Sequence, residues 1–342
     1  MIKIGMIGLG GMGHGHAQTL AKRSNAKVAW VCDLIEEKAR TTGELIGVKH
    51  CTDYRKWLNE VDAVWVSTEP FNRVEIVTTA AAAGKHIFTE KPIGLSLKDA
   101  DAMIAAAKKA KVIYMIGYCL RYWSPYRLVR DTFASGELGE LVTCWTRRFM
   151  PCDMRGRWYA DQSKSGGVVL DFGSHDIDIL RWIGGDAKTV FGHTSRVRDG
   201  IKADEHGTLM MKFKKGGCGT VDISWSSYVG ESSFGVIGTK GSIIVGNDGV
   251  VRKRVGEKDP EQILDAKGVT SIDPTGNLSK DPHSRKQGED MYAHFLRCVE
   301  EKVQPISNAE EGRKTLTWLA VIQSMKTGAS VDITEIATAK KR

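Results

Sequence analysis

The stretch Ile2-Lys3-Ile4-Gly5-Met6-Ile7-Gly8-Leu9-Gly10-Gly11-Met12-Gly13 joins a short apolar run to a GxGxxG motif. A strand, this motif and a following helical pattern together are typical of a Rossmann dinucleotide-binding unit. There Gly8 permits a tight turn, Gly10 lets the backbone approach a pyrophosphate, and Gly13 allows close helix–strand packing. The helix N-terminus offers N–H groups and a positive dipole to the phosphates. We therefore expect the loop to bind a dinucleotide through Gly8, Gly10, Gly11, Met12 and Gly13.

Asp33 lies twenty residues after Gly13 and closes the second predicted strand. A carboxylate at this place accepts hydrogen bonds from both ribose hydroxyls of the cofactor. It also repels a 2′-phosphate, and the following Leu34 supplies no cation. The sequence therefore favours NAD over NADP, while a plain turn-forming role for Asp33 stays open.

The first part of the chain alternates short apolar runs with amphipathic patterns, as βαβ units do. The predicted strands are Ile2–Gly8, Lys27–Asp33, Ala63–Ser67, His86–Thr89 and Val112–Ile116. The predicted helices between them are His14–Lys22, Glu36–Ile46, Arg73–Ala83 and Leu97–Ala110. We expect an α/β fold whose residues 1–119 form a Rossmann domain with a parallel sheet.

A different pattern follows, with a helix after Ser124-Pro125, a strand from Leu141, an irregular stretch to Gly167 and a helix from about Ser174 to Ile183. From Thr189 to Val251, strands separated by Gly, Asp and Lys-Gly-Gly turns predict an antiparallel meander. Asp290–Glu301 and Ala309–Lys326 are predicted as closing helices. Residues 120–335 are therefore expected to form an α+β domain on a mostly antiparallel sheet.

Charge and composition exclude several classes of protein. The 342 residues carry a net charge of +8, but the basic residues occur in short groups with acidic residues between them, which disfavours a nucleic-acid partner. No apolar run approaches the ~20 residues of a membrane helix, and the first residues do not resemble a secretory signal. Seven scattered cysteines without a CxxC pair argue against disulfides and a metal site. These features predict a cytoplasmic protein.

Two short motifs carry candidate catalytic groups. Glu90-Lys91-Pro92 follows the strand His86–Thr89, at a strand end where such sheets bind ligands. Lys91 there could polarise a substrate oxygen, although a surface lysine is the simpler interpretation. Asp171 and His175 are four residues apart, so on one helical turn the carboxylate can orient the imidazole as a general base. The alternative is a helix-capping Asp beside a structural His.

Taken together, these motifs resemble the Gfo/Idh/MocA oxidoreductase family, which includes inositol dehydrogenases and glucose–fructose oxidoreductase. The resemblance rests on Gly8–Gly13, Thr68 with its loop, Gly84 through Pro92, Ser135-Gly136-Glu137-Leu138-Gly139 and Gly166 through Trp182. It implies a Rossmann domain and, over residues 120–335, a C-terminal domain that binds substrate and whose large open sheet often forms homodimers or homotetramers. It implies catalytic roles for Lys91, Asp171 and His175, and cofactor contacts from Thr68, Glu90 and Lys91. By the same resemblance, Arg121, Tyr122 and Trp158 are candidate substrate residues.

One segment departs from the family pattern. Relatives usually read Thr-Pro-Asn-x-x-His where this chain reads Thr68-Glu69-Pro70-Phe71-Asn72-Arg73. With Thr68 aligned, Pro70 replaces the family's Asn and Arg73 its His. The side-chain contact expected from that Asn is therefore in question, while the backbone turn can survive.

The sequence therefore predicts an NAD-dependent dehydrogenase acting on a secondary hydroxyl of a sugar, sugar derivative or cyclitol, with His175 and Lys91 handling the proton. Two alternatives remain open: a regulatory protein that binds dinucleotide without turnover, and a glycosidase that cycles tightly bound NAD internally. The substrate itself is not determined, because loops of the second domain shape the pocket.

Overall fold

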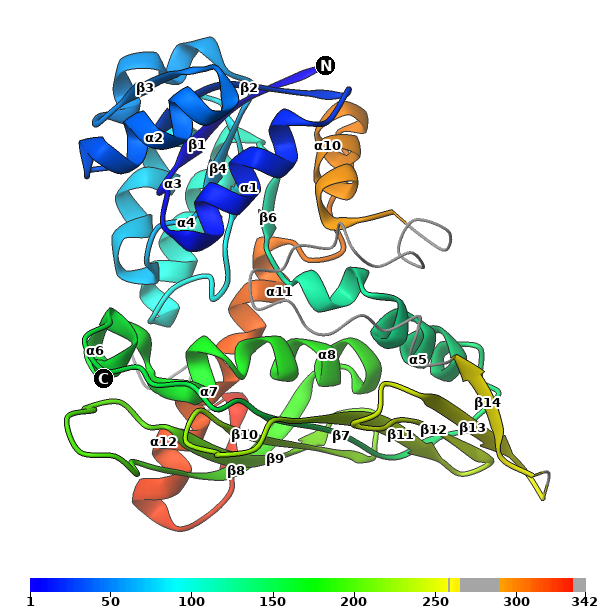
Figure 1. Cartoon of the computed structure of the whole chain (residues 1–342). Coiled ribbons are helices and arrows are strands. Elements are labelled where there is room, and N and C mark those ends of the chain that lie inside the picture. The colour runs from blue at the N-terminus through cyan, green and yellow to red at the C-terminus, as the bar shows by residue number, and fades with distance from the viewer. Residues whose placement is uncertain (258, 265–288, 335–342) are drawn as a thin grey trace. The chain divides into compact units, whose positions relative to one another are not determined.

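The computed structural model describes residues 1–257, 259–264 and 289–334 (Figure 1). They form two compact units. The first comprises Met1–Cys119 and Glu289–Arg313, and the second comprises residues 120–264 and 314–334.

The first unit is built on a six-stranded sheet in which every neighbouring pair of strands is parallel. Its order is β3-β2-β1-β4-β5-β6, so the order reverses between β1 and β4. In open parallel sheets, ligands bind outside the carboxyl ends of the strands at this reversal. The predicted Rossmann sheet is confirmed, and β3 is a short addition. The strands are β1 (Ile2–Ile7), β2 (Ala26–Cys32), β3 (Lys49–Cys51), β4 (Ala63–Val66), β5 (His86–Thr89) and β6 (Tyr114–Ile116).

The helices of this unit have local sequence signals at their ends. Ser96 caps α4, because its Oγ accepts from Asp99 N at 3.1 Å. Gly47 ends α2 in the left-handed conformation that favours glycine. The helical elements are α1 (Gly11–Ala21), α2 (Glu36–Ile46), η1 (Tyr54–Glu60), η2 (Pro70–Asn72), α3 (Arg73–Ala82), α4 (Leu97–Ala110), α10 (Met291–Glu301) and α11 (Ala309–Lys314).

Aromatic rings form the centre of the first core. Trp65 of β4 stacks on Phe88 of β5 with ring centroids 3.5 Å apart, and on Tyr292 of α10 at 5.2 Å. Phe295 of α10 meets Trp65 and Phe88 edge-on. Glu289–Arg313 falls within the range expected for the second domain, yet it groups with the first unit because α10 covers these rings.

The second unit is built on a nine-stranded sheet of order β14-β13-β12-β11-β7-β10-β9-β8-β15. All its strand pairs are antiparallel except β7 with β10. The expected mostly antiparallel sheet is confirmed. The strands are β7 (Leu141–Phe149), β8 (Ala187–Ser195), β9 (His206–Phe213), β10 (Cys218–Ser224), β11 (Glu231–Gly238), β12 (Gly241–Val245), β13 (Val251–Val255), β14 (Glu261–Leu264) and β15 (Val331–Asp332).

Helices pack on one face of this sheet: α8 contacts β7 and β10, α5 contacts β11 and β12, and α12 contacts β8.

The stretch before Gly167, expected to be irregular, contains η4 and α6. The single closing helix predicted over Ala309–Lys326 is wrong, because Thr315 and Thr317 interrupt it and β-branched residues favour helices less. The helical elements are η3 (Cys119–Tyr122), α5 (Ser124–Ala134), η4 (Trp158–Ala160), α6 (Gln162–Ser165), α7 (Gly167–Asp171), α8 (Ser174–Gly184), η7 (Thr315–Thr317) and α12 (Trp318–Thr327).

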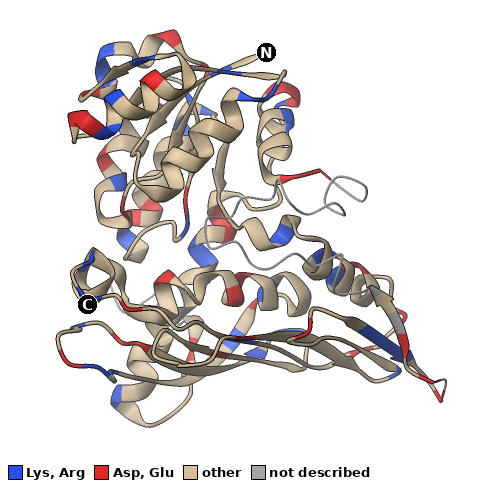
Figure 2. Cartoon of the chain, in the orientation of Figure 1, with Lys and Arg blue, Asp and Glu red and all other residues tan. Residues whose placement is uncertain are grey.

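No helix in the described part of the chain has the length and apolar character needed to cross a membrane. Lys and Arg alternate with Asp and Glu over the ribbons of both units (Figure 2).

The aromatic core yields a stability test at Trp65, which is fully buried. Its Nε1 has no hydrogen-bond partner among the described residues. We expect Trp65→Ala to lower the free energy of unfolding by about 3–5 kcal/mol, because it leaves a cavity. Trp65→Phe should cost much less, because it keeps a ring and removes an unpaired N–H.

The matched control is Trp30→Phe, since Trp30 is equally buried but its Nε1 donates to Trp57 O at 3.0 Å. Urea denaturation of the wild type and the three variants measures the free energy of unfolding of each and so ranks the losses. If Trp65→Phe costs more than Trp30→Phe, the indole N–H of Trp65 is stabilising and this account of the core is wrong.

Candidate active site

The glycine loop joins β1 to α1, and two of its glycines lie very close to neighbouring backbone atoms. Gly8 has a φ of +85°, and a Cβ there would lie 2.7 Å from Thr68 N. A Cβ on Gly13 would lie 1.9 Å from the carbonyl oxygen of Gly8. Side chains at these positions are therefore excluded, and the first turn of α1 lies directly against the carboxyl ends of β1 and β4.

The other side of the same loop is open. A Cβ built on Gly10 or Gly11 meets no atom within 4 Å. α1 begins at Gly11 with no side-chain cap and no acidic residue in its first turn, and Met12 is half-buried there. The loop therefore has free space beside an unshielded positive helix end, which fits the pyrophosphate of a dinucleotide.

Asp33 ties the end of β2 to this loop. Its Oδ2 accepts from Leu9 N at 2.7 Å, and its Oδ1 accepts from Ile35 N at 2.9 Å. The sequence suggested Asp33 as a ribose acceptor or as a turn former at the strand end; the bond from Ile35 N is such a turn contact, and the bond from Leu9 N adds a role in holding the loop. Leu34 beside it is 87% exposed.

Thr68, at the loop after β4, is held by the buried side chain of Arg73. The guanidinium donates to Thr68 O from Nε at 3.0 Å and from Nη2 at 2.6 Å. Its Nη1 donates to the carbonyl oxygens of Glu90 and Pro92. One side chain of α3 therefore joins the loops that follow β4 and β5.

Glu90 belongs to a buried hydrogen-bonded chain. Its Oε1 accepts from His16 Nε2 at 2.8 Å, and His16 Nδ1 lies 2.7 Å from Tyr292 OH. Burial alone raises the pKa of the Glu90 carboxyl. The hydrogen bond from His16, with the nearby charges of Lys91 and Arg73, outweighs burial and holds that pKa below its usual value.

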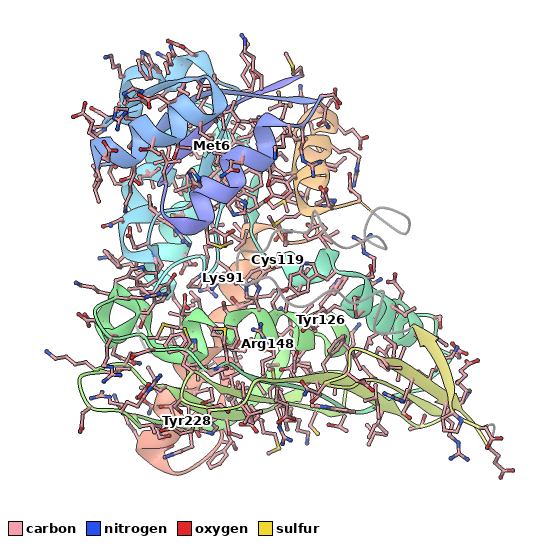
Figure 3. All side chains as sticks on the ribbon, viewed as in Figure 1. Met6, Lys91, Cys119, Tyr126, Arg148 and Tyr228 are labelled. Atoms are coloured by element: carbon pink, nitrogen blue, oxygen red, sulfur yellow. The ribbon has the colours of Figure 1, made fainter. Side chains whose placement is uncertain are left out.

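Lys91 follows β5 on the loop that carries Glu90, and Figure 3 labels it. Its side chain is half-buried, and its backbone N–H donates to Glu90 Oε2 at 3.1 Å. The structure thus brings the predicted cofactor residues of the first unit to the carboxyl ends of β1, β2, β4 and β5.

The second unit carries Asp171 and His175. Asp171 is the last residue of α7, and His175 lies in the first turn of α8. Phe172 and Gly173 between them keep right-handed helical angles, so the two helices follow each other closely. Both side chains are buried, with 8% and 9% of their surface exposed.

Buried ion pairs anchor α8. Arg121 donates to Asp178 from Nε and Nη2, both at 2.7 Å, and the two side chains are at most 2% exposed. Arg148 of β7, labelled in Figure 3, pairs with Asp176 at 2.5 Å and also donates to Phe172 O. These pairs fix the helix that presents His175. A substrate contact by Arg121 stays a prediction.

The other two substrate candidates lie in the same unit. Tyr122 is buried in η3. Trp158, in η4, is half-buried and stacks on Tyr159 with ring centroids 3.9 Å apart. Their contact with a substrate stays a prediction. Within the described residues, no group of three or more His, Cys, Asp or Glu side chains could hold a metal ion.

Sequence reasoning missed His16, Tyr292 and the role of Arg73. His16 is three residues beyond Gly13, on the face of α1 that turns toward the sheet, so helical periodicity could have marked it as buried. Tyr292 is 276 residues away from its partner His16, and no local signal links the two.

Comparison with known proteins gives a consistent result. Residues 2–118 match the model of an oxidoreductase family with an NAD-binding Rossmann fold, and residues 126–244 match the GFO/IDH/MocA C-terminal domain. Myo-inositol 2-dehydrogenase of Thermotoga maritima is 32% identical over 72% of this chain and 75% of its own. A scyllo-inositol 2-dehydrogenase (NAD(+)) of Bacillus subtilis is 28% identical over 97% of this chain and 96% of its own.

Among solved structures, an oxidoreductase from Agrobacterium radiobacter in complex with NAD+, L-tartaric acid and magnesium has the same fold. It superimposes with a TM-score of 0.85 at 22% identity, over 98% of this chain and 99% of that chain.

The depressed pKa of Glu90 gives a test of the buried chain. A carboxyl whose pKa is lower in the folded protein stabilises it fully above the unfolded value of 4.5 and progressively less as the pH falls through the folded value. We expect the stability advantage of the wild type over Glu90→Gln to shrink as the pH falls from neutral to values below 4.5. Thermal unfolding across this range measures it, with the exposed Glu300→Gln of α10 as control. A constant advantage would mean that Glu90 is protonated in the folded protein.

Proposed function

Because the chain belongs to the GFO/IDH/MocA family of NAD-binding oxidoreductases, we propose that it oxidises a secondary hydroxyl of a sugar, sugar derivative or cyclitol. The observation that carries the proposal is the shared position of Lys91 and the glycine loop at one edge of the parallel sheet. This arrangement allows one bound dinucleotide to lie beside a lysine able to touch a reacting oxygen.

The chemistry divides between the cofactor and the chain. NAD, when bound, supplies the nicotinamide that accepts a hydride from the alcohol carbon. The proposed role of Lys91 is to hold the reacting oxygen by hydrogen bonding, which favours loss of the hydroxyl proton. His175 takes that proton as general base, and Asp171 orients the imidazole. Whether the proton ends on His175 or on Lys91 is a question for the pH profile.

Asp33 supports NAD over NADP. One of its oxygens accepts from Leu9 N of the glycine loop and the other from Ile35 N, which holds the carboxylate beside the loop, where it would repel a 2′-phosphate. Leu34 and Ile35, which follow it, carry no positive charge. The relatives named above act on myo-inositol and scyllo-inositol, which makes cyclitols the first substrates to test.

The decisive experiment follows NADH absorbance with inositols, aldoses, glucosides and anhydrosugars, using NAD and NADP in parallel. We expect one substrate class to reduce NAD. Lys91→Ala and His175→Ala should each lower kcat by about 10²–10⁴-fold, the usual contribution of a proton-transfer group. Lys98→Ala, an exposed lysine of α4, is the matched control and should retain full activity.

Other outcomes separate the alternatives. NAD binding without turnover of any substrate would favour a regulatory protein. Release of an aglycone without net NADH would favour the internally cycling glycosidase. Full activity of Lys91→Ala would contradict the proposed mechanism even if the reaction itself is found. The seven scattered cysteines, with no CxxC pair, suit a reducing compartment, and we place the reaction in the cytoplasm.

We also propose that the chain forms a homodimer or homotetramer through the nine-stranded sheet. On the face opposite the helices, cross-strand neighbours form a row over β8, β9, β10, β7, β11 and β12. In order, its members are Phe191, Met210, Thr220, Trp145, Gly235 and Ile244. Phe191, Met210 and Ile244 are 43%, 50% and 37% exposed. An apolar row of this kind fits a second copy of the same surface.

Light scattering after gel filtration tests this assembly. Met210→Glu should shift the mass toward that of a monomer, because a buried unpaired charge is costly at an interface. Leu45→Glu is the control, since Leu45 is similarly exposed but lies on α2. A monomeric wild type, or an unchanged mass in Met210→Glu, would exclude this interface.

A further inference from the structure

We propose that Arg73 is a positioning residue that sets the place of Lys91 relative to the dinucleotide loop. This inference rests on the proposed role of Lys91 and concerns how the chain holds that lysine. It is built on contacts within the first unit.

Arg73 binds the residues that come directly before and after Lys91 in the sequence. Nη1 donates to the carbonyl oxygens of Glu90 and Pro92, the residues on either side of Lys91. Nε and Nη2 of the same guanidinium donate to Thr68 O at 3.0 and 2.6 Å. Any displacement of the Lys91 segment relative to Thr68 must therefore stretch these hydrogen bonds.

Thr68 is in turn in contact with the dinucleotide loop. A Cβ added to Gly8 would lie only 2.7 Å from the backbone N of Thr68, so the Thr68 segment and the glycine turn are in direct contact. Arg73 thereby links the place of Lys91 to the place of the cofactor loop. The proposed reaction needs this link, because hydride transfer depends on the distance between the substrate carbon and the nicotinamide.

Arginine suits this task for two reasons. Its contacts use three nitrogens of one rigid plane, whereas a histidine has at most two N–H donors and a lysine presents all its donors from one atom. It is also charged at every physiological pH, and it is only 2% exposed, so its hydrogen bonds are shielded from water.

The sequence supports a role particular to this chain. Arg73 stands at the position where the family pattern has histidine, and Pro70 stands where it has asparagine. The two changes occur in one turn, since Pro70 begins η2 and Arg73 begins α3. The loss of the asparagine contact is thus accompanied by a new side chain that holds both loops.

The test compares Arg73→Lys and Arg73→His with the wild type. We expect kcat to fall about 10- to 100-fold, the usual effect of a small misplacement of a reacting group. The KM for NAD should change less than kcat, because the glycine loop and Asp33 remain. Hydrogen exchange should become faster in residues 87–94 and stay unchanged in α4. Arg313→Lys, which alters an ion pair with Asp101 in the same unit, is the control.

A double-mutant cycle distinguishes positioning from general destabilisation. In a Lys91→Ala background, Arg73→Lys should lower the remaining kcat no further, because the group that it positions is gone. If Arg73→Lys lowers kcat by the same factor in the wild-type and Lys91→Ala backgrounds, the proposal is wrong. It is also wrong if Arg73→Lys has the kcat and the hydrogen exchange of the wild type. If neither Arg73 variant folds, Arg73 is a folding residue and the proposal is wrong.

The experiments distinguish a failure of the proposed function from a failure of the proposed role of Arg73. An active Lys91→Ala enzyme would remove the catalytic role of Lys91, whereas the exchange of residues 87–94 would still report whether Arg73 holds this segment.

Discussion

The close contact between Gly13 and Gly8 constrains the whole first unit. With no side chain between them, α1 starts directly against the ends of β1 and β4, and its open end faces the space beside Gly10 and Gly11. The same approach brings His16 within hydrogen-bonding distance of Glu90. His16 also bonds Tyr292, so a helix near the end of the chain completes the core formed by its first hundred residues.

Buried arginines hold the segments that carry the candidate catalytic residues. Arg73 holds the Lys91 segment, and Arg121 and Arg148 hold α8 through Asp178 and Asp176. The ion pairs of Arg121 and Arg148 add little net stability, because removing two charges from water costs about as much as their attraction returns. Their geometry is strict, however, since a guanidinium fork accepts few arrangements. The guanidinium contacts, to carbonyl oxygens in the first unit and to carboxylates in the second, therefore favour one position of each segment over others.

Much of the fold follows from local patterns. The strands of the parallel sheet and the glycine turn depend on residues close together in the chain, so the sequence predicts them. The prediction of one continuous helix over Ala309–Lys326 was wrong. The interruption at Thr315–Thr317 depends on packing, and β-branched residues disfavour a helix only weakly. The short helices before α7 were also missed, since elements of three or four residues carry little periodicity.

By itself, the sequence determined the Rossmann unit, the NAD-type loop and the candidate groups Lys91, Asp171 and His175, because each rests on a compact motif. The departure at Arg73 was visible in the sequence, but its meaning was not. Only the tertiary structure decided that its guanidinium binds the carbonyl oxygens of Thr68, Glu90 and Pro92, and that α10 joins the first unit. The physical reason is that burial and hydrogen bonding between distant residues arise only when the chain is folded, and no local pattern encodes them.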